Sequence, residues 1–419
     1  MTTFHIQTSG CQANQADSEQ MAGLLKKAKF ELVETIEDAD VVVFNTCTAK
    51  NPGETSFFTE LEQFRTEHPY KMVVIAGCIP SADKQKLKEY CLLGTKQIHN
   101  IVQVVEEALH DNVLHLLSNE EMPPLNLPKV RKNPVVEIIP INRGCLKVFT
   151  VTKTKKAPLN LVSYPVAEIV EAATKAVAEG VQELWLTSQD TFCYGLDIGT
   201  DLPMLLDELV KIPGNFKIKV GTGNPDHMMK IGTRLVEAYK HPKMFKFLHL
   251  PLYAGHDETL KAMQRNYTVE EFLQVINSFK RDIPEINLVT DVIVGYLTET
   301  DDHYWGTLEV VRKTTPDFIN ISRFWPRPEI DLPELPQEVV EHRFKVLTDI
   351  FHNASKLRNE RWLDWQGEII IDEKKDGHWM GRNDSYKQVL VEGDFKLGDK
   401  VKVQIVKAER FDLRGRVLQ

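Results

Sequence analysis

The sequence predicts an α/β protein with three regions: an N-terminal Rossmann-like parallel sheet, a central partial TIM-like (β/α)6 barrel and a C-terminal small all-β barrel. Over residues 1–118 and again over 135–357, short apolar runs alternate with helix-like segments, which is typical of parallel sheets. Residues 358–419 hold several short strand-like runs separated by glycine-containing turns, which indicates a small barrel. The proline-rich segment 119–134 is predicted to be a linker.

Composition is that of a water-soluble globular protein. The 419 residues are 42% hydrophobic and 26% charged, and the formal net charge of -9 argues against unspecific adhesion to nucleic acid, which needs a basic surface. No apolar run approaches the roughly 20 residues of a membrane span, and the N-terminus lacks a signal-peptide pattern. The 6 cysteines are widely spaced, as in a reducing compartment. We therefore expect a cytoplasmic monomer without a membrane partner.

In the first region, three apolar runs each end near a cysteine, namely Cys11, Cys47 and Cys78. Helix-like segments separate these runs, so the strands are expected to be parallel, with their carboxyl ends at one edge of the sheet. Ligand sites of open α/β sheets lie beyond that edge, so the cysteines are predicted to converge on one metal centre. The alternative for any one of them, and our expectation for Cys91, is a buried structural cysteine. Three cysteines in the same local position favour the metal centre.

The central region opens with an apolar run, residues 138–141, that leads into Asn142-Arg143-Gly144-Cys145. A strand of a parallel barrel delivers a reactive residue to the barrel mouth in this way. Because the chemistry of such barrels gathers at the C-terminal ends of the strands, Cys145 is a candidate functional residue.

Beyond this strand, Lys153-Thr154-Lys155, Ser163-Tyr164-Pro165 and the segment 186–190 follow in an order typical of one enzyme family. Over nearly all its residues the chain resembles the tRNA methylthiotransferases of the radical S-adenosylmethionine (SAM) superfamily, and residues 191–200 look most like the archaeal and eukaryotic type that modifies threonylcarbamoyladenosine. The resemblance implies 2-methylthiolation of N6-threonylcarbamoyladenosine at position 37 of tRNA. It also implies the tRNA anticodon stem-loop as partner and a reductant such as ferredoxin or flavodoxin.

The resemblance further implies two 4Fe-4S clusters. The family's motifs Gly-Cys-x-x-Asn, Asn-x-Cys and Gly-Cys are matched here, so the auxiliary cluster that handles the sulfur would be held by Cys11, Cys47 and Cys78. The second cluster binds SAM and takes three thiolates from Cys-x-x-x-Cys-x-x-Cys, but here Cys145 is followed by Phe149 and Thr152 at the other two positions. A phenyl ring has no lone pair and a hydroxyl is a hard ligand. We therefore expect this second cluster, and with it SAM cleavage, to be lost.

By resemblance, SAM would be surrounded by residues at the strand ends: Ser188, Gln189, Asp190, Asn224, His249, Asp291 and Gly295. Each has an alternative: Asp190 caps a turn, Asn224 begins a common Asn-Pro turn, and His249 is a hydrogen-bonded core histidine. The chain also departs from the family here, with Tyr253 in place of glutamine and Leu297 in place of proline. We hypothesise an apolar plug of the barrel mouth, made by Phe149, Leu159, Tyr253 and Leu297.

In the last region, residues 381–387 resemble the family's TRAM domain, an RNA-binding barrel, and basic residues concentrate near the C-terminus. An aromatic ring that stacks on a base and a guanidinium that contacts phosphate are the usual elements of such a surface. The predicted RNA-binding residues are Arg382, Tyr386, Lys387, Lys407, Arg410 and Arg414. The alternative is an ordinary solvated basic face.

Two functions other than the complete enzyme stay open from the sequence. One is a catalytically inactive tRNA-binding relative that keeps the auxiliary cluster and the RNA-binding barrel. The other is an iron-sulfur or sulfur carrier that never contacts RNA. A count of irons per chain separates a chain with two clusters from a chain with one.

Overall fold

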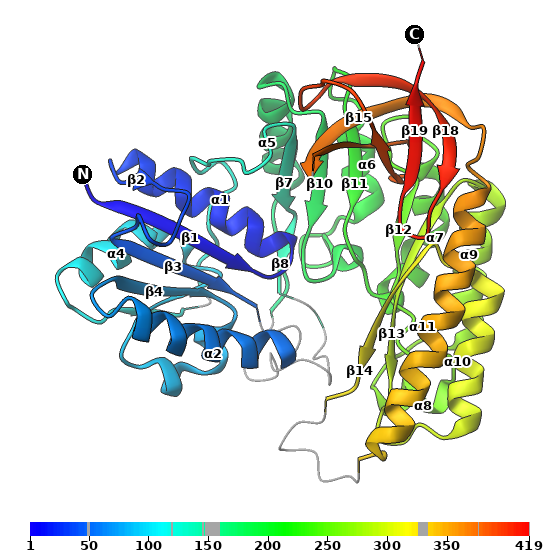
Figure 1. The fold of residues 1–419 in the computed structure, drawn as a ribbon, viewed down its shortest axis with the longest axis horizontal. Helices are drawn as coiled ribbons and strands as arrows, with labels where there is room; N and C mark the ends of the chain where they lie inside the picture. The colour runs from blue at the N-terminus through cyan, green and yellow to red at the C-terminus, as the bar shows by residue number, and fades with distance from the viewer. Residues whose placement is uncertain are drawn as a thin grey trace. The chain divides into compact units, whose positions relative to one another are not determined.

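The computed structural model describes residues 1–418 except 48–50, 119, 145, 147–159, 326–333 and 376, with backbone alone at 51–56. The chain forms two compact units (Figure 1). The first contains residues 1–132, 138–164 and 187–189, and the second contains residues 133–137, 165–186 and 190–419. Within the described residues, no helix is both long and apolar enough to span a membrane.

The first unit is built on one six-stranded sheet with the order β2-β1-β3-β4-β5-β6. Its strands are β1 (Thr3–Ser9), β2 (Glu31–Leu32), β3 (Val41–Thr46), β4 (Met72–Gly77), β5 (Cys91–Gly94) and β6 (His115–Leu116). Every neighbouring pair is parallel. The predicted N-terminal parallel sheet is thereby confirmed.

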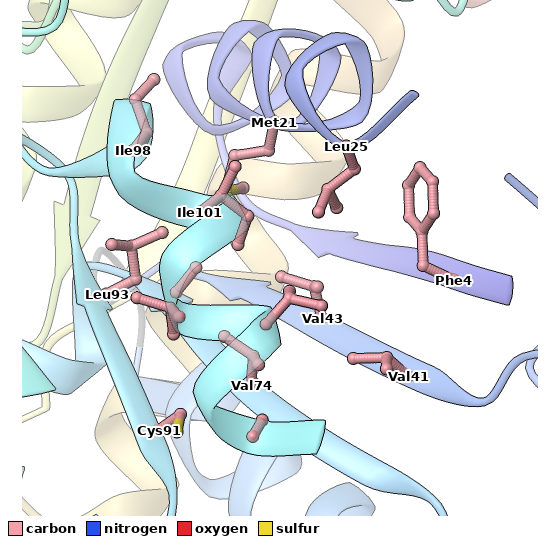
Figure 2. Packing of buried hydrophobic residues seen from close by; sticks show 14 of the residues in the cluster. Phe4, Met21, Leu25, Val41, Val43, Val74, Cys91, Leu93, Ile98 and Ile101 are labelled. Carbon is pink, nitrogen blue, oxygen red and sulfur yellow. The ribbon is translucent and has the colours of Figure 1, made fainter. Parts of the chain in front are cut away.

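Helices cover both faces of this sheet, because successive side chains of a strand point to opposite faces. Val41 and Val43 of β3 pack with Met21 and Leu25 of α1 (Gln12–Lys27) and with the face of α4 (Ile101–Leu109), as Figure 2 shows. Val42 and Phe44 face the other way, toward the rings that α2 (Asn51–Glu67) carries. Each fully buried apolar side chain of this kind contributes about 1.5–3 kcal/mol, so both faces fix the positions of the strand ends.

The segment predicted as a linker lies against α1. The backbone N–H of Val130 donates to the carbonyl of Glu19 at 2.8 Å, and the amide of Gln20 donates to the carbonyl of Leu125 at 3.3 Å. At Gly23 of the same helix, an added Cβ would lie 2.2 Å from the carbonyl oxygen of Pro128. The segment therefore packs closely on the helix instead of crossing solvent.

In the second region, strands and helices alternate as predicted. The strands are β7 (Val136–Pro140), β10 (Glu183–Thr187), β11 (Lys217–Val220), β12 (Phe247–His249), β13 (Asn287–Val294) and β14 (Phe318–Arg323). The helices are α5 (Val166–Ala178), α6 (Leu202–Leu209), α7 (Pro225–Tyr239), α8 (Asp257–Ala262), α9 (Val269–Asp282), α10 (Asp301–Thr314) and α11 (Gln337–Glu360). A short antiparallel pair, β8 (Asn142–Arg143) with β9 (Val162–Ser163), accompanies them.

These strands form two three-stranded sheets, ordered β11-β10-β7 and β12-β13-β14. The pairs β10–β11, β12–β13 and β13–β14 are parallel. A parallel bridge between Ile218 of β11 and Met244 connects the first sheet to the segment that leads into β12. The predicted mixed α/β architecture is confirmed, whereas closure into one partial TIM-like barrel stays a prediction.

The C-terminal residues form a closed five-stranded barrel, which confirms the predicted small all-β barrel. Its strands are β15 (Gln366–Lys375), β16 (His378–Arg382), β17 (Gln388–Val391), β18 (Lys400–Ala408) and β19 (Leu413–Val417), in the order β15-β16-β17-β19-β18. Alternate residues of the strands fill its interior, including Ile369, Ile371, Val389, Val403, Ile405 and Leu413.

A buried carboxylate joins the barrel to the strands of its own unit. Asp317, just before β14, accepts from Arg358 at 3.0 Å, from Arg361 at 3.3 Å and from Lys387 at 3.0 Å. Burial by itself raises the pKa of Asp317, but Lys387 and the two arginines outweigh it and hold that pKa below its ordinary value. Because Lys387 belongs to the barrel and Arg358 to α11, one carboxylate ties three elements together.

Candidate functional sites

The strands of the first unit bring the three predicted cysteine ligands to one edge. Ser9 of β1 pairs with Thr46 of β3, and Thr46 pairs with Gly77 of β4, so the three strand ends are level. Cys11, Cys47 and Cys78 each follow one of these ends by one or two residues. The N–H of Cys78 donates to the carbonyl of Thr46 at 2.8 Å, which fixes the third cysteine beside the second strand.

The thiols at this edge interact with one another and are open to solvent. A hydrogen bond with Cys47, followed by burial, raises the pKa of the Cys11 thiol. The side-chain oxygen of Asn14 accepts from both the N–H and the thiol of Cys11, each at 3.3 Å. Cys11 is exposed, and Cys47 and Cys78 are half-buried.

Two buried asparagines hold the cysteine loops in place. The amide of Asn45 donates to the carbonyl of Asn14 at 2.7 Å and to the hydroxyl of Ser18 at 2.8 Å. The amide of Asn14 donates back to the side-chain oxygen of Asn45 and to the carbonyl of Thr46, both at 3.2 Å. This reciprocal bonding explains why asparagines accompany the cysteines in the sequence, since it satisfies the polar groups of both loops.

Glycines let the cysteine loops approach each other. Gly77 has φ +97°, and an added Cβ would lie 2.2 Å from the carbonyl oxygen of Thr46. At Gly10, an added Cβ would lie 2.9 Å from the Cβ of Cys47. The residue before Cys11 and the residue before Cys78 must therefore both be glycine for these loops to pack as closely as they do.

The donor set of this edge fits a 4Fe-4S cluster. Three soft thiolates from separate loops can hold three irons of a cluster and leave the fourth iron for another ligand. A structural zinc site takes four protein ligands, and the described residues of this edge supply three.

A buried ion pair that was not identified from the sequence positions the chain just before Cys145. The guanidinium of Arg143 donates to the two oxygens of Asp17 at 2.6 and 3.2 Å and to the carbonyl of Thr95 at 2.9 Å. Burial raises the pKa of Asp17 despite the charge of Arg143 beside it. The Arg-Gly pair before the cysteine was the available signal, because an arginine at the end of an apolar strand needs a buried partner.

Part of the predicted SAM site lies outside the described residues, namely Cys145, Phe149, Thr152 and Leu159. Of the residues that follow β10, Gln189 is exposed, Ser188 is half-buried and Asp190 is buried.

Asp190 is fully engaged within its own unit. One oxygen accepts from the N–H groups of Phe192 at 3.1 Å and Asn224 at 2.9 Å, and the other is 2.6 Å from Nδ1 of His227. Asn224 in turn caps α7, since its side chain accepts from the N–H of Asp226 at 3.2 Å. These contacts are the turn-capping roles that the sequence left as alternatives.

His249, the last residue of β12, lies beside Asp291 in the middle of β13. Nε2 of His249 lies 3.2 Å from Asp291, whose other oxygen accepts from the amide of Asn320 at 2.6 Å. Nδ1 of His249 lies 2.5 Å from the hydroxyl of Thr222. The result is a half-buried polar row that runs from Thr222, just after β11, through His249 to Asp291 and Asn320 within β13 and β14. This row can hydrogen-bond a polar ligand. Gly295, at φ +80°, is nearby in sequence and donates to Glu299 at 2.9 Å.

Of the proposed apolar plug, two residues are described. Leu297 is buried. Tyr253 is half-buried with φ +61°, and the guanidinium of Arg265 lies over its ring at 3.9 Å from the centroid. A tyrosine at positive φ is strained, so its conformation depends on the contacts around it. Whether the plug forms stays a prediction.

The structure corrects the prediction that Tyr386 stacks on an RNA base. Its ring lies within 4.9 to 6.1 Å of the rings of Phe245, Phe247 and Trp185, and Lys219 lies 4.4 Å from its centroid. The π-surface that a base would need is therefore in contact with the protein itself.

Arg382 and Lys387 are also committed to the protein. Arg382 donates to Asp372 at 3.0 Å and lies over the ring of Tyr386, and the buried Lys387 pairs with Asp317. The contacts of these two residues argue against the prediction that they bind RNA, because withdrawing Arg382 would take the cation from the buried Asp372, and withdrawing Lys387 would remove one of the three cations around Asp317. Of the remaining predicted residues, Lys407 and Arg410 are exposed and Arg414 is half-buried, and Lys407 and Arg414 pair with the nearby Glu409 and Asp412.

The cluster around Tyr386 predicts a pH effect on stability. Burial, and then the charge of Asp372, raise the pKa of the buried Glu183 to about 8, above its ordinary value of 4.5. An acid with a higher pKa in the folded chain gives stability that is lost as pH rises toward the folded pKa. Glu183→Gln cannot ionise, so it should match the wild type at a pH of about 5 and exceed it by on the order of 2 kcal/mol at a pH of about 8.5.

Urea unfolding at the two pH values measures this difference. The control is Glu179→Gln, at an exposed position four residues before Glu183. Its free energy of unfolding relative to the wild type should be the same at both pH values. Equal stability of wild type and Glu183→Gln at both pH values would contradict the assignment of a raised pKa to Glu183.

Family models match most of the chain in three segments. Residues 3–93 match Uncharacterized protein family UPF0004, residues 151–311 match the Radical SAM superfamily, and residues 368–418 match the TRAM domain.

Relatives match over nearly the whole chain. It is 38% identical over 433 residues to the threonylcarbamoyladenosine tRNA methylthiotransferase of Drosophila melanogaster, which covers 99% of this chain and 77% of that protein. It is 35% identical over 412 residues to a probable threonylcarbamoyladenosine tRNA methylthiotransferase of Pyrococcus abyssi, covering 95% and 96% of the two chains. Among solved structures, the radical S-adenosylmethionine methyltransferase TsrM from Kitasatospora setae superposes with a TM-score of 0.53 at 12% identity, over 77% of this chain and 73% of that one. This last likeness is one of fold.

Proposed function

Because this chain belongs to the threonylcarbamoyladenosine tRNA methylthiotransferase family, we propose that it binds tRNA at the N6-threonylcarbamoyladenosine of position 37 and carries one iron-sulfur cluster, without cleaving SAM itself. The observation that carries this proposal is the sequence after β8, where Phe149 and Thr152 stand at two of the three cysteine positions of the radical SAM motif. Membership of the radical SAM family implies iron-sulfur binding, and the donor sets decide which cluster is kept.

The auxiliary cluster is assigned to Cys11, Cys47 and Cys78. Support comes from the level strand ends, the contact between two thiols and the reciprocal bonding of Asn14 and Asn45. When bound, such a cluster supplies iron that can carry sulfur for transfer. The chain's own residues would hold it at the sheet edge, and the two glycines would allow the thiols to converge.

The SAM-binding cluster does not fit the residues of this chain. It needs three thiolates, and the only cysteine of the motif is Cys145. Neither Phe149 nor Thr152 donates a soft electron pair to iron. SAM as a bound partner, and ferredoxin or flavodoxin as reductant, therefore have no role in the function proposed for the chain as written.

The tRNA would be received by the second unit. We assign its two sheets to one partial TIM-like barrel, since the bridge between Ile218 and Met244 joins the first sheet to the segment before β12, and the polar row that includes His249 and Asp291 runs from β11 to β14. The TRAM barrel of the same unit supplies exposed cations. The anticodon stem-loop is the part of the tRNA that contains position 37, so it is the part proposed to enter.

Binding of tRNA to the full chain tests this proposal. We expect affinity to fall with salt, because phosphate contacts release counterions, and the double change Lys407→Gln with Arg414→Gln should lower the logarithmic salt slope by about 2. Deleting the barrel is not a usable test, because it would leave Asp317 without Lys387. Fluorescence anisotropy at several salt concentrations gives the slope.

The matched control is Lys26→Gln with Lys27→Gln, which removes the same charge from exposed positions of α1. That control should leave the slope unchanged. No measurable tRNA binding by the wild type would contradict the proposed function and favour a sulfur carrier that never contacts RNA.

A further inference from the structure

Three aromatic rings from distant parts of the sequence meet on the surface of the second unit. Phe351 of α11 is only 4% exposed, whereas Phe318 at the start of β14 is 40% exposed and Phe411, between β18 and β19, is 55% exposed. Ring centroids are 5.4 Å apart for Phe318 and Phe351, and 6.4 Å apart for Phe318 and Phe411. We call these three residues the aromatic platform. Single exposed hydrophobic residues are ordinary, but two adjacent exposed rings over a buried third form a surface that favours a partner.

The loop that carries Phe411 is held rigidly. The hydroxyl of Ser355 donates to the carbonyl of Arg410 at 2.6 Å, and the amide of Asn359 donates to the carbonyl of Glu409 at 2.8 Å. Both side chains are buried on α11. Within the loop, the N–H of Glu409 donates to the carbonyl of Asp412 at 2.9 Å. Phe411 is therefore presented in a fixed position, which lowers the entropy lost when it binds a partner.

One cation without a carboxylate partner among the described residues lies beside the platform. The guanidinium of Arg410 lies 3.2 Å from Nδ1 of His352, and no carboxylate among the described residues is within ion-pair distance of it. His352 itself packs edge-on against Phe411, with ring centroids 5.7 Å apart. Lys407 and Arg414 flank the loop and pair with its own acidic residues, Glu409 and Asp412. A cation without an acidic partner beside exposed rings suits a ligand that is flat and apolar on one side and anionic on the other.

We propose that the aromatic platform stacks an unpaired base of the bound tRNA, with Arg410 contacting the phosphate next to that base. This inference rests on the proposed function and names the surface that receives the RNA. Unpaired nucleotides combine an exposed π-face with an adjacent phosphate, and they are the usual targets of exposed aromatic and arginine side chains. The guanidinium of Arg410, which has no carboxylate partner among the described residues, matches the phosphate that accompanies each base, so the observations favour RNA.

The test measures the affinity of the full chain for a tRNA that carries N6-threonylcarbamoyladenosine at position 37. Phe411→Ala should weaken binding about tenfold, because stacking on one ring is lost, and should leave the salt slope unchanged. Arg410→Gln should weaken binding and lower the salt slope by about 1. Phe411→Trp should bind with wild-type affinity, because tryptophan keeps a flat ring at this position. The matched control is Trp305→Ala, at another exposed aromatic residue of the same unit, on α10, which should bind as the wild type does.

Two readouts separate stacking from a structural role. Phe411→Leu keeps an apolar contact with the platform but loses the flat face, so it should fold with the wild-type melting temperature and bind RNA as weakly as Phe411→Ala. A fully paired RNA duplex of equal length should bind Phe411→Ala and wild type alike, because it offers no free base.

Equal tRNA affinity of Phe411→Ala and wild type would overturn the platform while leaving the proposed function intact. Equal losses for tRNA and duplex would also overturn it, because they would show that Phe411 acts without an unpaired base. Failure of the wild type to bind tRNA would instead overturn the proposed function.

Discussion

Anaerobic reconstitution of this chain with iron and sulfide is expected to give about four irons per chain, against about eight for a relative with two clusters. The physical reason is the number of thiolates at each site. Cys11, Cys47 and Cys78 follow three level strand ends and supply three soft donors. At the second site Cys145 is the only cysteine of the motif. Iron and acid-labile sulfide analysis of the desalted protein measures the ratio.

Single substitutions assign the iron to its ligands. Cys47→Ala should remove most of the iron, because two thiolates and no third ligand do not retain a cluster through desalting. Cys145→Ala is the matched control and should leave the iron content unchanged. A reproducible value near eight, or iron that depends on Cys145, would show that the motif with Phe149 and Thr152 still binds a cluster.

The second large effect concerns the radical reaction. Incubation of the chain with SAM, dithionite and tRNA is expected to yield no 5'-deoxyadenosine above the level without protein. Reductive cleavage requires SAM to chelate the free iron of a cluster with three thiolates, and Phe149 and Thr152 remove two of these thiolates. Cys193 does not replace them, because it is fully buried and its thiol donates to the carbonyl of Asp190 at 3.1 Å. Chromatography of the quenched reaction quantifies the nucleoside.

The double change Phe149→Cys with Thr152→Cys is the informative companion. It should restore a second cluster and 5'-deoxyadenosine formation. Product from the unmodified chain at the rate of the repaired chain would refute the proposed loss of the radical step. If neither chain forms 5'-deoxyadenosine, a second feature of the barrel mouth must block the reaction. Tyr253 and Leu297 are the candidates for that feature among the described residues.

The sequence was sufficient where the signal was local. Cys11, Cys47 and Cys78 each follow an apolar run, and parallel strands must end at one edge, so their placement at that edge follows from chain order alone. The small barrel was likewise predicted from short runs and glycine turns, and it is closed as expected.

Long-range packing was beyond the reach of the sequence. Tyr386 and Arg382 have the residue types of an RNA-binding surface, but Phe245, Phe247 and Trp185 lie far away in the sequence and surround the tyrosine only in the folded unit. The aromatic platform was missed for the same reason, since Phe318, Phe351 and Phe411 belong to three elements with no shared motif. Residue type indicates what a side chain can bind, whereas packing decides whether it is free to do so.

The carboxylate of Asp317 has a consequence for how this sequence can change over time. Its three cationic partners, Arg358, Arg361 and Lys387, come from α11, the turn after it and the barrel. Loss of Asp317 alone would leave three positive charges facing one another in a dry interior, at a cost of about 3–5 kcal/mol. Loss of one cation is easier to tolerate, because two remain. We therefore expect substitutions at these four positions to be correlated among relatives, with a cation replaced before Asp317 is. The barrel and the strands would then evolve together.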